Sequence, residues 1–268
     1  MASFLTSTQL AKLLAVSPAT IRRWANSGLL PAERTAGGHR RFSLAVAERI
    51  ARQKDGHQPG TDDWVRLLVA PGAPLAVDAA LLAARSREDG WYVGAETIGK
   101  VLLELGVRWQ RGHLSVVDEH IASSRLARAL SRVADSLPSR DDAPRALLAV
   151  APGDHHTLGL SLVELVMREC GWGVTWIGQS VPTELLVGRV NAGGCDALAI
   201  SASVFSPPEG LQRAASQISD ACARRGMDLV VGGRGAWPDQ LTHGSVVRTF
   251  ERLRAWMAGV DARRRRTL

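Results

Sequence analysis

The chain has 268 residues, of which 46% are hydrophobic and 22% are charged, and this is an ordinary globular composition with room for two or three domains. It has no run of about 18 apolar residues that would span a membrane, and its start lacks the layout of a secretory signal. We therefore expect a cytoplasmic protein with no membrane partner. The three cysteines are scattered, which argues against disulfides or a thiolate metal site and favours reduced thiols in the core.

The net charge of +7 is concentrated at one end of the chain. Residues 1–54 carry nine Lys or Arg against two acidic residues, whereas residues 55–268 carry 24 of each. A basic segment on an electrically balanced body is typical of a nucleic-acid-binding module. A second basic cluster, Arg263 to Arg266, ends the chain. We expect residues 261–268 to be a disordered tail that adds nonspecific attraction.

The N-terminal segment has the pattern of a helix, a tight turn and a second helix. Thr6 and Gln9 have the spacing of a capping box, and Ser17 with Pro18 begins the next helix, which ends at Gly28. Four side chains face away from the apolar stripe of this second helix and are expected to meet DNA phosphates and base edges. They are Thr20, Arg22, Arg23 and Asn26.

A basic hairpin follows, because Gly37 and Gly38 form a turn signal between two potential strands. The basic side chains on its edge are His39, Arg40 and Arg41. Such a hairpin is a wing, and Ser43 can cap a further helix through about Lys54. The order of a capped helix, S-P-A-T-I-R-R-W, G-L-L-P and G-G-H-R-R-F over residues 5–53 resembles the MerR family of winged-helix transcription regulators. The resemblance implies a DNA-binding domain over residues 1–54 with a double-stranded DNA operator as its partner.

Residues 55–63 are polar and turn-rich, which indicates a linker. Residues 64–140 then have helical periodicity. The expected helices cover 65–69, 75–87, 91–109 and 114–137. Apolar residues recur at helix spacing on the last two, which favours a four-helix bundle. They are Leu102, Leu105, Trp109, Val117, Ile121, Leu126 and Leu130.

From residue 143 to residue 260, short apolar runs alternate with helical patterns. The expected strands are 146–151, 174–178, 197–203 and 228–231, and the expected helices are 158–170, 183–190, 209–225 and 247–258. This alternation predicts a doubly wound parallel sheet of about five strands, with ligands at the carboxyl ends of the strands. The whole chain is therefore expected to be a multidomain α and α/β protein: winged helix-turn-helix, helical bundle and Rossmann-like domain.

The loop after the first predicted strand contains D-x-H-x-x-G, formed by Asp154, His156 and Gly159. His156 can offer one ring nitrogen to a metal while the other donates to Asp154, which fixes the tautomer. Alone, this motif is weak evidence, and a surface histidine explains it better. Its spacing adds weight, because 41 residues separate Gly159 from Ser201 and 28 separate Ser203 from Gly232.

These spacings, with the Gly232-Gly233 pair, resemble the cobalamin-binding pattern of methionine synthase and the corrinoid mutases. The resemblance implies that His156 takes the place of dimethylbenzimidazole on the cobalt, and that the nucleotide tail enters a slot lined by Ser201, Gly232 and Gly233. Glycine leaves room for the tail, and the Ser201 hydroxyl can bond to the base. Ser203 stands where that pattern has Leu, which alters packing in the slot.

The helical region carries W-x9-E-H, formed by Trp109, Glu119 and His120. With the MerR-like head, the whole chain resembles the CarH/LitR family of adenosylcobalamin-dependent photoreceptor repressors. The resemblance implies adenosylcobalamin as the cofactor, with these three residues around its 5′-deoxyadenosyl group. Well-known members have a His directly after the Trp as the upper cobalt ligand in the light. This chain has Gln110 there, and an amide is a poor ligand for cobalt(III).

The leading interpretation is a light-responsive repressor, a dimer or tetramer in which adenosylcobalamin controls oligomerisation and DNA binding. Gln110 favours one alternative, a light-independent cobalamin-sensing regulator. A rival from another class is a corrinoid carrier or methyltransferase subunit, because a bundle with this sheet domain also serves methyl transfer. The MerR-like head counts against the rival, as does the lack of an obvious nucleophile or zinc-thiolate cluster, so we do not expect an enzyme. The sequence leaves repression and activation both open.

Overall fold

The computed structural model describes residues 4–14, 16–55, 59–71, 74–87, 90–138 and 142–267. The chain divides into two compact units, Met1–Leu137 and Pro138–Leu268. Within the described ranges, no helix combines the length and the apolar composition that a membrane crossing requires. Within the first unit, helix α3 (Leu44–Asp55) packs against helix α5 (Pro74–Arg87).

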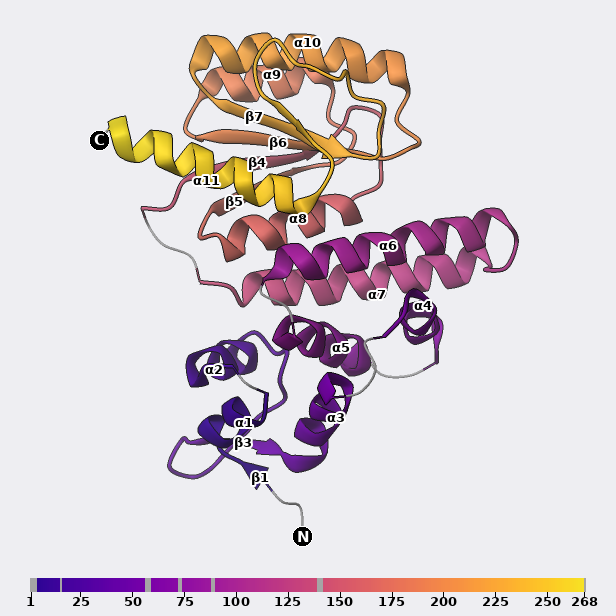
Figure 1. Cartoon of the computed structure of the whole chain (residues 1–268), viewed down its shortest axis with the longest axis vertical. Helices are drawn as coiled ribbons and strands as arrows, with labels where there is room; N and C mark the ends of the chain where they lie inside the picture. Colours follow the sequence, from indigo (N-terminus) through magenta and orange to yellow (C-terminus); the bar gives the residue numbers. More distant parts are fainter. Residues whose placement is uncertain are drawn as a thin grey trace. The chain divides into compact units, whose positions relative to one another are not determined.

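The first unit begins with a winged helix-turn-helix (Figure 1). Helices α1 and α2 follow strand β1 in the chain. Strand β3 lies between β1 and β2 in a small antiparallel sheet, and α3 follows directly from β3. The bounds are β1 (Phe4–Leu5), α1 (Ser7–Leu14), α2 (Pro18–Asn26), β2 (Glu33–Arg34) and β3 (Arg40–Ser43). The predicted hairpin is present. The sequence has no signal for β1, because two residues are too few to show alternation.

Both predicted helix starts in the head are confirmed. The hydroxyl of Thr6 accepts the N–H of Gln9 at 3.2 Å, and the Gln9 side chain accepts the N–H of Thr6 at 2.9 Å. The hydroxyl of Ser17 accepts the N–H of Thr20 at 3.0 Å. These bonds satisfy amide groups that have no partner inside a helix. Gly28, with φ of +77°, then turns the chain away from α2.

The four expected helices of the bundle are present. They are α4 (Thr61–Val69), α5 (Pro74–Arg87), α6 (Trp91–Gln110) and α7 (Val116–Asp135). Helix α4 begins inside the expected linker 55–63, because the Asp63 carboxylate accepts the N–H of Gly60 at 3.0 Å and caps its first turn. Residues 56–58 of that linker lie outside the described residues.

Apolar side chains on the bundle are exposed where the helix spacing favours packing. Val117 is 66% exposed and Ile121 is 36% exposed, whereas Leu126 further along α7 is fully buried. The bonds that tie α7 to its neighbours come from its later turns: Arg125 donates to the carbonyl of Leu68 at 2.8 Å. Arg132 pairs with the buried Asp78 of α5 at 2.6 Å. The early turns of α7 therefore carry exposed apolar side chains, whereas the apolar side chains of its later turns are mostly buried.

The second unit is a five-stranded parallel sheet between two helical layers (Figure 1). The strand order is β5-β4-β6-β7-β8. Helices α9 and α10 cover one face and helices α8 and α11 cover the other. The bounds are β4 (Arg145–Val150), α8 (Leu158–Glu169), β5 (Gly173–Gly178), α9 (Thr183–Ala192), β6 (Ala197–Ala202), α10 (Pro208–Arg225), β7 (Asp228–Gly233), β8 (Ser245–Val247) and α11 (Phe250–Thr267). The predicted fold class is confirmed.

Several expectations for the second unit are wrong. Residues 245–247 form the edge strand β8, so the last helix begins at Phe250 and not at residue 247. Arg263 to Arg266, expected to be disordered, lie in the last turns of α11. Arg263 pairs with Asp228 at 2.7 Å, and the negative end of the helix dipole also favours these cations. Cys170, expected in the core, is exposed at the end of α8.

Candidate functional site

The loops after β4 and β6 form the centre of the candidate site, at the carboxyl edge of the sheet. Strands β5 and β6 lie on opposite sides of β4, so the strand order reverses at this point. Doubly wound sheets bind ligands in the crevice outside such a switch point. Asp154 and His156 follow β4, and Ser203 and Ser206 follow β6. Four polar side chains thus come together from two segments that are distant in sequence.

Asp154 is a buried carboxylate that ties the two loops together. One oxygen accepts the N–H of Ser203 at 2.6 Å and the hydroxyl of Ser206 at 2.5 Å. The other accepts the N–H of His156 at 2.9 Å. Burial by itself raises the pKa of Asp154, but these hydrogen bonds outweigh it and hold the pKa well below its usual range. The resulting stabilisation is complete above about pH 4 and is lost as the pH falls through the folded-state pKa.

His156 is oriented through its Nδ1 atom. This atom lies 2.7 Å from Oδ1 of Asp154 and 3.2 Å from Oγ of Ser203. The imidazole also stacks on Phe205, with ring centroids 4.9 Å apart. An ionised carboxylate beside Nδ1 favours a proton on that nitrogen and leaves the lone pair of Nε2 for a ligand. Because the side chain is 55% exposed, a metal can approach it.

Phe205 and Ser206 belong to this site and are absent from the sequence-based predictions. The hydroxyl of Ser203 accepts the N–H of Phe205 at 3.1 Å, which shapes the loop that places the Phe205 ring on His156. The sequence did contain a signal for Ser206, because three serines, at 201, 203 and 206, cluster at the end of a fully buried strand. Ser203 stands where the cobalamin pattern has Leu, and its hydroxyl makes a polar contact with the His156 ring.

The remaining cofactor candidates of this unit lie side by side. Ser201 of β6 is paired with Gly232 of β7, and Ala202 is paired with Gly233. Gly159, in the first turn of α8, adjoins them, because a Cβ there would lie 3.1 Å from Oγ of Ser201. The structure thus brings the three sequence motifs together at one edge of the sheet.

The two glycines have a backbone explanation as well as the expected one. A Cβ on Gly232 would lie 2.8 Å from the carbonyl oxygen of Val247, and a Cβ on Gly233 would lie 2.3 Å from that of Ala202. Gly233 also has φ of +85°. Close approach of the neighbouring chain segments thus requires glycine at both positions, with or without a nucleotide tail.

We predict that Gly233→Ala lowers the free energy of unfolding of the ligand-free chain by at least about 1–3 kcal/mol, because the positive φ and the Ala202 carbonyl both oppose a Cβ. Urea unfolding measures this change. Gly188→Ala is the control, since Gly188 lies within α9 with open space around it. That variant is expected to gain up to about 1 kcal/mol. Equal stability of Gly233→Ala and the wild type would contradict the prediction.

The three W-x9-E-H residues lie at one end of the α6–α7 hairpin. Trp109 is in the last turn of α6 and is 41% exposed, while Glu119 and His120 begin α7. Glu119 contacts Nδ1 of His120 at 2.7 Å and accepts the hydroxyl of Ser123 at 2.5 Å. Over the described residues, no hydrogen bond joins the Trp109 indole to this pair. The side chain of His120 is 75% exposed and thus open to a ligand.

The candidate DNA surface consists of α2 and the wing. Arg22 is exposed, and Arg23 donates to the hydroxyl of Thr20 at 3.3 Å. Thr20 also bonds to the Ser17 hydroxyl at 2.9 Å, so it supports the start of the helix. Arg40 of the wing donates to the side chain of Asn26 at the end of α2, which joins the two elements. The other wing candidates, His39 and Arg41, lie on the same hairpin.

Comparison with known proteins agrees with both halves of this description. Residues 6–42 match the family model of the MerR family regulatory proteins, and residues 144–250 match that of the B12 binding domain. The chain joins a MerR-type domain to a B12 binding domain. The resemblance of the N-terminal segment to MerR regulators and that of the C-terminal segment to cobalamin-binding proteins are thereby confirmed for these two domains. The His156 loop lies near the start of the B12 binding domain.

Two curated relatives are the HTH-type transcriptional repressors CarA and CarH of Myxococcus xanthus. The chain is 36% identical to CarA over 51% of its own length and 45% of CarA, and 30% identical to CarH over 53% of its own length and 46% of CarH. The match therefore spans less than half of each relative. The monomethylamine corrinoid protein of Methanosarcina barkeri has a similar fold, with a TM-score of 0.59, 18% identity, and coverage of 75% of this chain and 95% of that one.

Proposed function

We propose that this protein is a transcription repressor that binds operator DNA through its MerR-type domain and senses adenosylcobalamin through its B12 binding domain. One observation carries most of the proposal. In a chain with a basic winged helix, His156 has its Nδ1 fixed by a buried carboxylate and its Nε2 free at the switch point of the sheet. The similarity to two named repressors supports the same conclusion.

The described residues fit a cobalamin. An imidazole nitrogen with a carboxylate behind it is a suitable ligand for cobalt, and His156 would provide it. Ser201, Gly232 and Gly233 would adjoin the nucleotide tail. Trp109, Glu119 and His120 would adjoin the adenosyl group, as the family resemblance implies. Bound adenosylcobalamin supplies a light-labile cobalt–carbon bond.

In this proposal, regulation requires that bundle residues and B12-domain residues both bind the cofactor. Residues of the bundle and of the B12 binding domain would each gain contacts when the cofactor is bound, so binding favours the conformation in which both contact it. We propose that this conformation forms a dimer or tetramer. Several MerR-type heads on one operator then bind with a high effective concentration. Loss of the adenosyl group removes the bundle contacts and lowers the affinity for DNA.

The test is a visible absorbance spectrum of the protein with adenosylcobalamin before and after green light, with sedimentation and DNA binding measured on both samples. The proposal expects a spectral change, a smaller oligomer and weaker DNA binding after light. Cofactor-dependent DNA binding that is unchanged by light would indicate the light-independent cobalamin sensor. Cobalamin binding without DNA binding would indicate the corrinoid carrier, whose fold the chain shares; the proposed regulator itself catalyses no reaction.

Gln110, the last residue of α6, leads to a prediction about the illuminated state. We expect the wild type to lack a stable bis-imidazole spectrum after light, because a side-chain amide competes poorly for cobalt(III). Gln110→His is expected to produce that spectrum and to retain the cofactor longer. His113→Ala and His120→Ala test the other nearby imidazoles. A stable bis-histidine spectrum in the wild type that neither of these variants alters would contradict this account of Gln110.

A further inference from the structure

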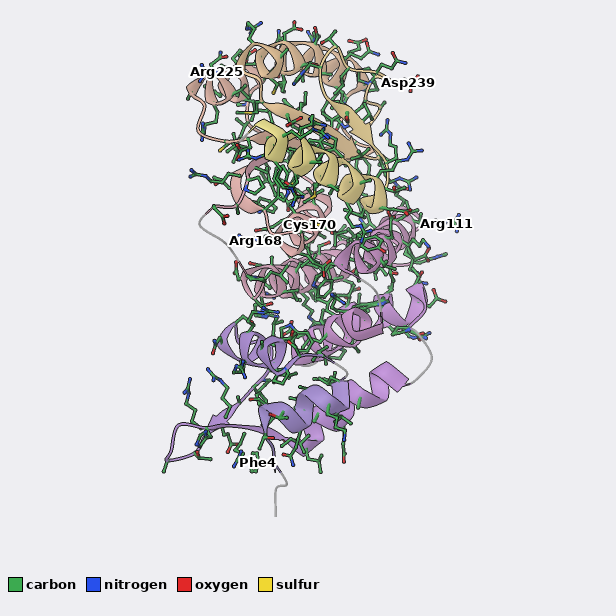
Figure 2. The ribbon with its side chains drawn as sticks, turned by 60° about the vertical axis from the view of Figure 1, so that its left-hand side comes forward. Phe4, Arg111, Arg168, Cys170, Arg225 and Asp239 are labelled. Carbon is green, nitrogen blue, oxygen red and sulfur yellow. The ribbon has the colours of Figure 1, made fainter. Side chains whose placement is uncertain are left out.

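The amino edge of the sheet in the second unit carries a cluster of arginines that the proposed cofactor site does not use. They lie in the last turns of α10 and α11 and form what we call the arginine rim. The arginine rim consists of Arg224, Arg225, Arg263, Arg264, Arg265 and Arg266. Figure 2 shows Arg225 at the opposite end of this unit from Asp239, which follows the carboxyl end of β7. The His156 site is at that carboxyl end.

Ion pairs fix the two helix ends to the sheet and to each other. Arg263 pairs with Asp228 at the start of β7 at 2.7 Å, and Arg264 pairs with Asp196 just before β6. The N–H of Asp228 donates to the carbonyl of Asp196 at 3.0 Å, so the two aspartates are neighbours. Arg225 ends α10 three residues before Asp228. The end of α10 and the end of α11 therefore lie beside the same pair of carboxylates.

Four members of the rim keep their charge available. Arg224, Arg225, Arg265 and Arg266 are exposed, and the structure as described gives none of them an ion pair. The adjacent carboxylates, Asp196 and Asp228, are already paired with the other two arginines. The rim is thus a concentration of positive charge within residues 55–268, which in total carry as many basic as acidic residues.

Helix stability alone does not account for this concentration of charge. A cation in the last turn interacts favourably with the helix dipole, by about 0.3–1 kcal/mol, and the effect is limited to that turn. Unpaired arginines close together repel one another, which offsets part of that gain. The sole use of arginine is informative, because its planar guanidinium pairs with phosphate oxygens in a two-pronged geometry that lysine lacks.

We propose that the arginine rim binds the backbone phosphates of double-stranded DNA, as a second contact besides the MerR-type head. Phosphate contacts carry no sequence information, so the rim would strengthen binding to any duplex. The choice of duplex DNA over other polyanions rests on the proposed function, in which the head of the same chain binds DNA and so raises its effective concentration at the rim. The rim and the His156 site lie at opposite edges of the sheet, so this contact does not require cobalamin.

The experiment measures the affinity of the full chain for a duplex of unrelated sequence over a range of salt concentrations. The rim variants are Arg224→Gln/Arg225→Gln and Arg265→Gln/Arg266→Gln. The control is Arg213→Gln/Arg252→Gln, which removes two exposed arginines from the same two helices away from the rim. Glutamine retains helix propensity, and circular dichroism checks the fold.

Each rim variant is expected to lower the salt slope by up to about two units and to weaken binding about three- to tenfold per lost contact near 0.1 M salt. The control is expected to keep the wild-type slope. Equal slopes in the rim variants and the control would overturn the proposal. Binding of poly-glutamate, which mimics an acidic protein, is measured on the same variants. A rim variant that loses affinity for poly-glutamate but keeps the wild-type salt slope on DNA would also overturn the proposal, because the rim would then bind an acidic protein. An Arg22→Gln/Arg23→Gln variant measured in parallel reports separately on the head.

Discussion

Replacing His156 by Ala is expected to abolish histidine coordination of bound cobalamin and to weaken cofactor binding strongly. Removal of a group that orients a metal ligand typically costs about 10–100-fold in affinity, and we expect this for Asp154→Asn. His156→Ala removes the ligand itself and is expected to cost more. The visible spectrum reports the loss of the imidazole, and equilibrium dialysis with cobalamin reports the affinity.

His155→Ala is the matched control for this experiment. His155 is also exposed, lies one residue away and makes no hydrogen bond to the Asp154 carboxylate in the described structure. Its replacement is expected to leave both the spectrum and the affinity unchanged. The assignment of His156 would be refuted if His156→Ala behaved like His155→Ala, because the protein would then hold cobalt without this nitrogen.

The sheet was predictable because its strands are short apolar runs separated by helical patterns. Four strands and the doubly wound order follow from that alternation. The edge strand β8 was not predictable, because three residues after a turn-rich loop are too few to show a period. Arg263 and Arg264 are helical and not disordered because they pair with carboxylates 35 or more residues away in the sequence. Local sequence cannot show such pairs.

The candidate site was predictable where function fixes a motif with a set spacing. Asp154, His156 and Ser201 stand in such motifs, and the parallel register then places them at one edge. Phe205 and Ser206 are different, because they reach Asp154 and His156 only through the fold of the loop after β6. Likewise, helix spacing gave no means of distinguishing the exposed Val117 from the buried Leu126 of the same helix.

In the MerR-type head, Arg22→Gln/Arg23→Gln is expected to remove most of the affinity for DNA. These two arginines lie on α2, which is expected to enter the major groove. A base-reading arginine contributes about 1–3 kcal/mol, and a phosphate contact contributes about one unit of the salt slope. Anisotropy titrations of a duplex at several salt concentrations measure both quantities.

Lys12→Gln is the control for the head, because Lys12 is an exposed cation on α1, the bracing helix. It is expected to have a small effect on both quantities. The arginine rim makes a further comparison possible, since the loss of Arg265 and Arg266 should weaken binding about three- to tenfold per lost contact while the head remains intact. If neutralising the arginines of residues 17–42 left DNA affinity unchanged and neutralising Arg263 to Arg266 abolished it, DNA binding would belong to the second unit. The winged helix would then have no part in binding DNA.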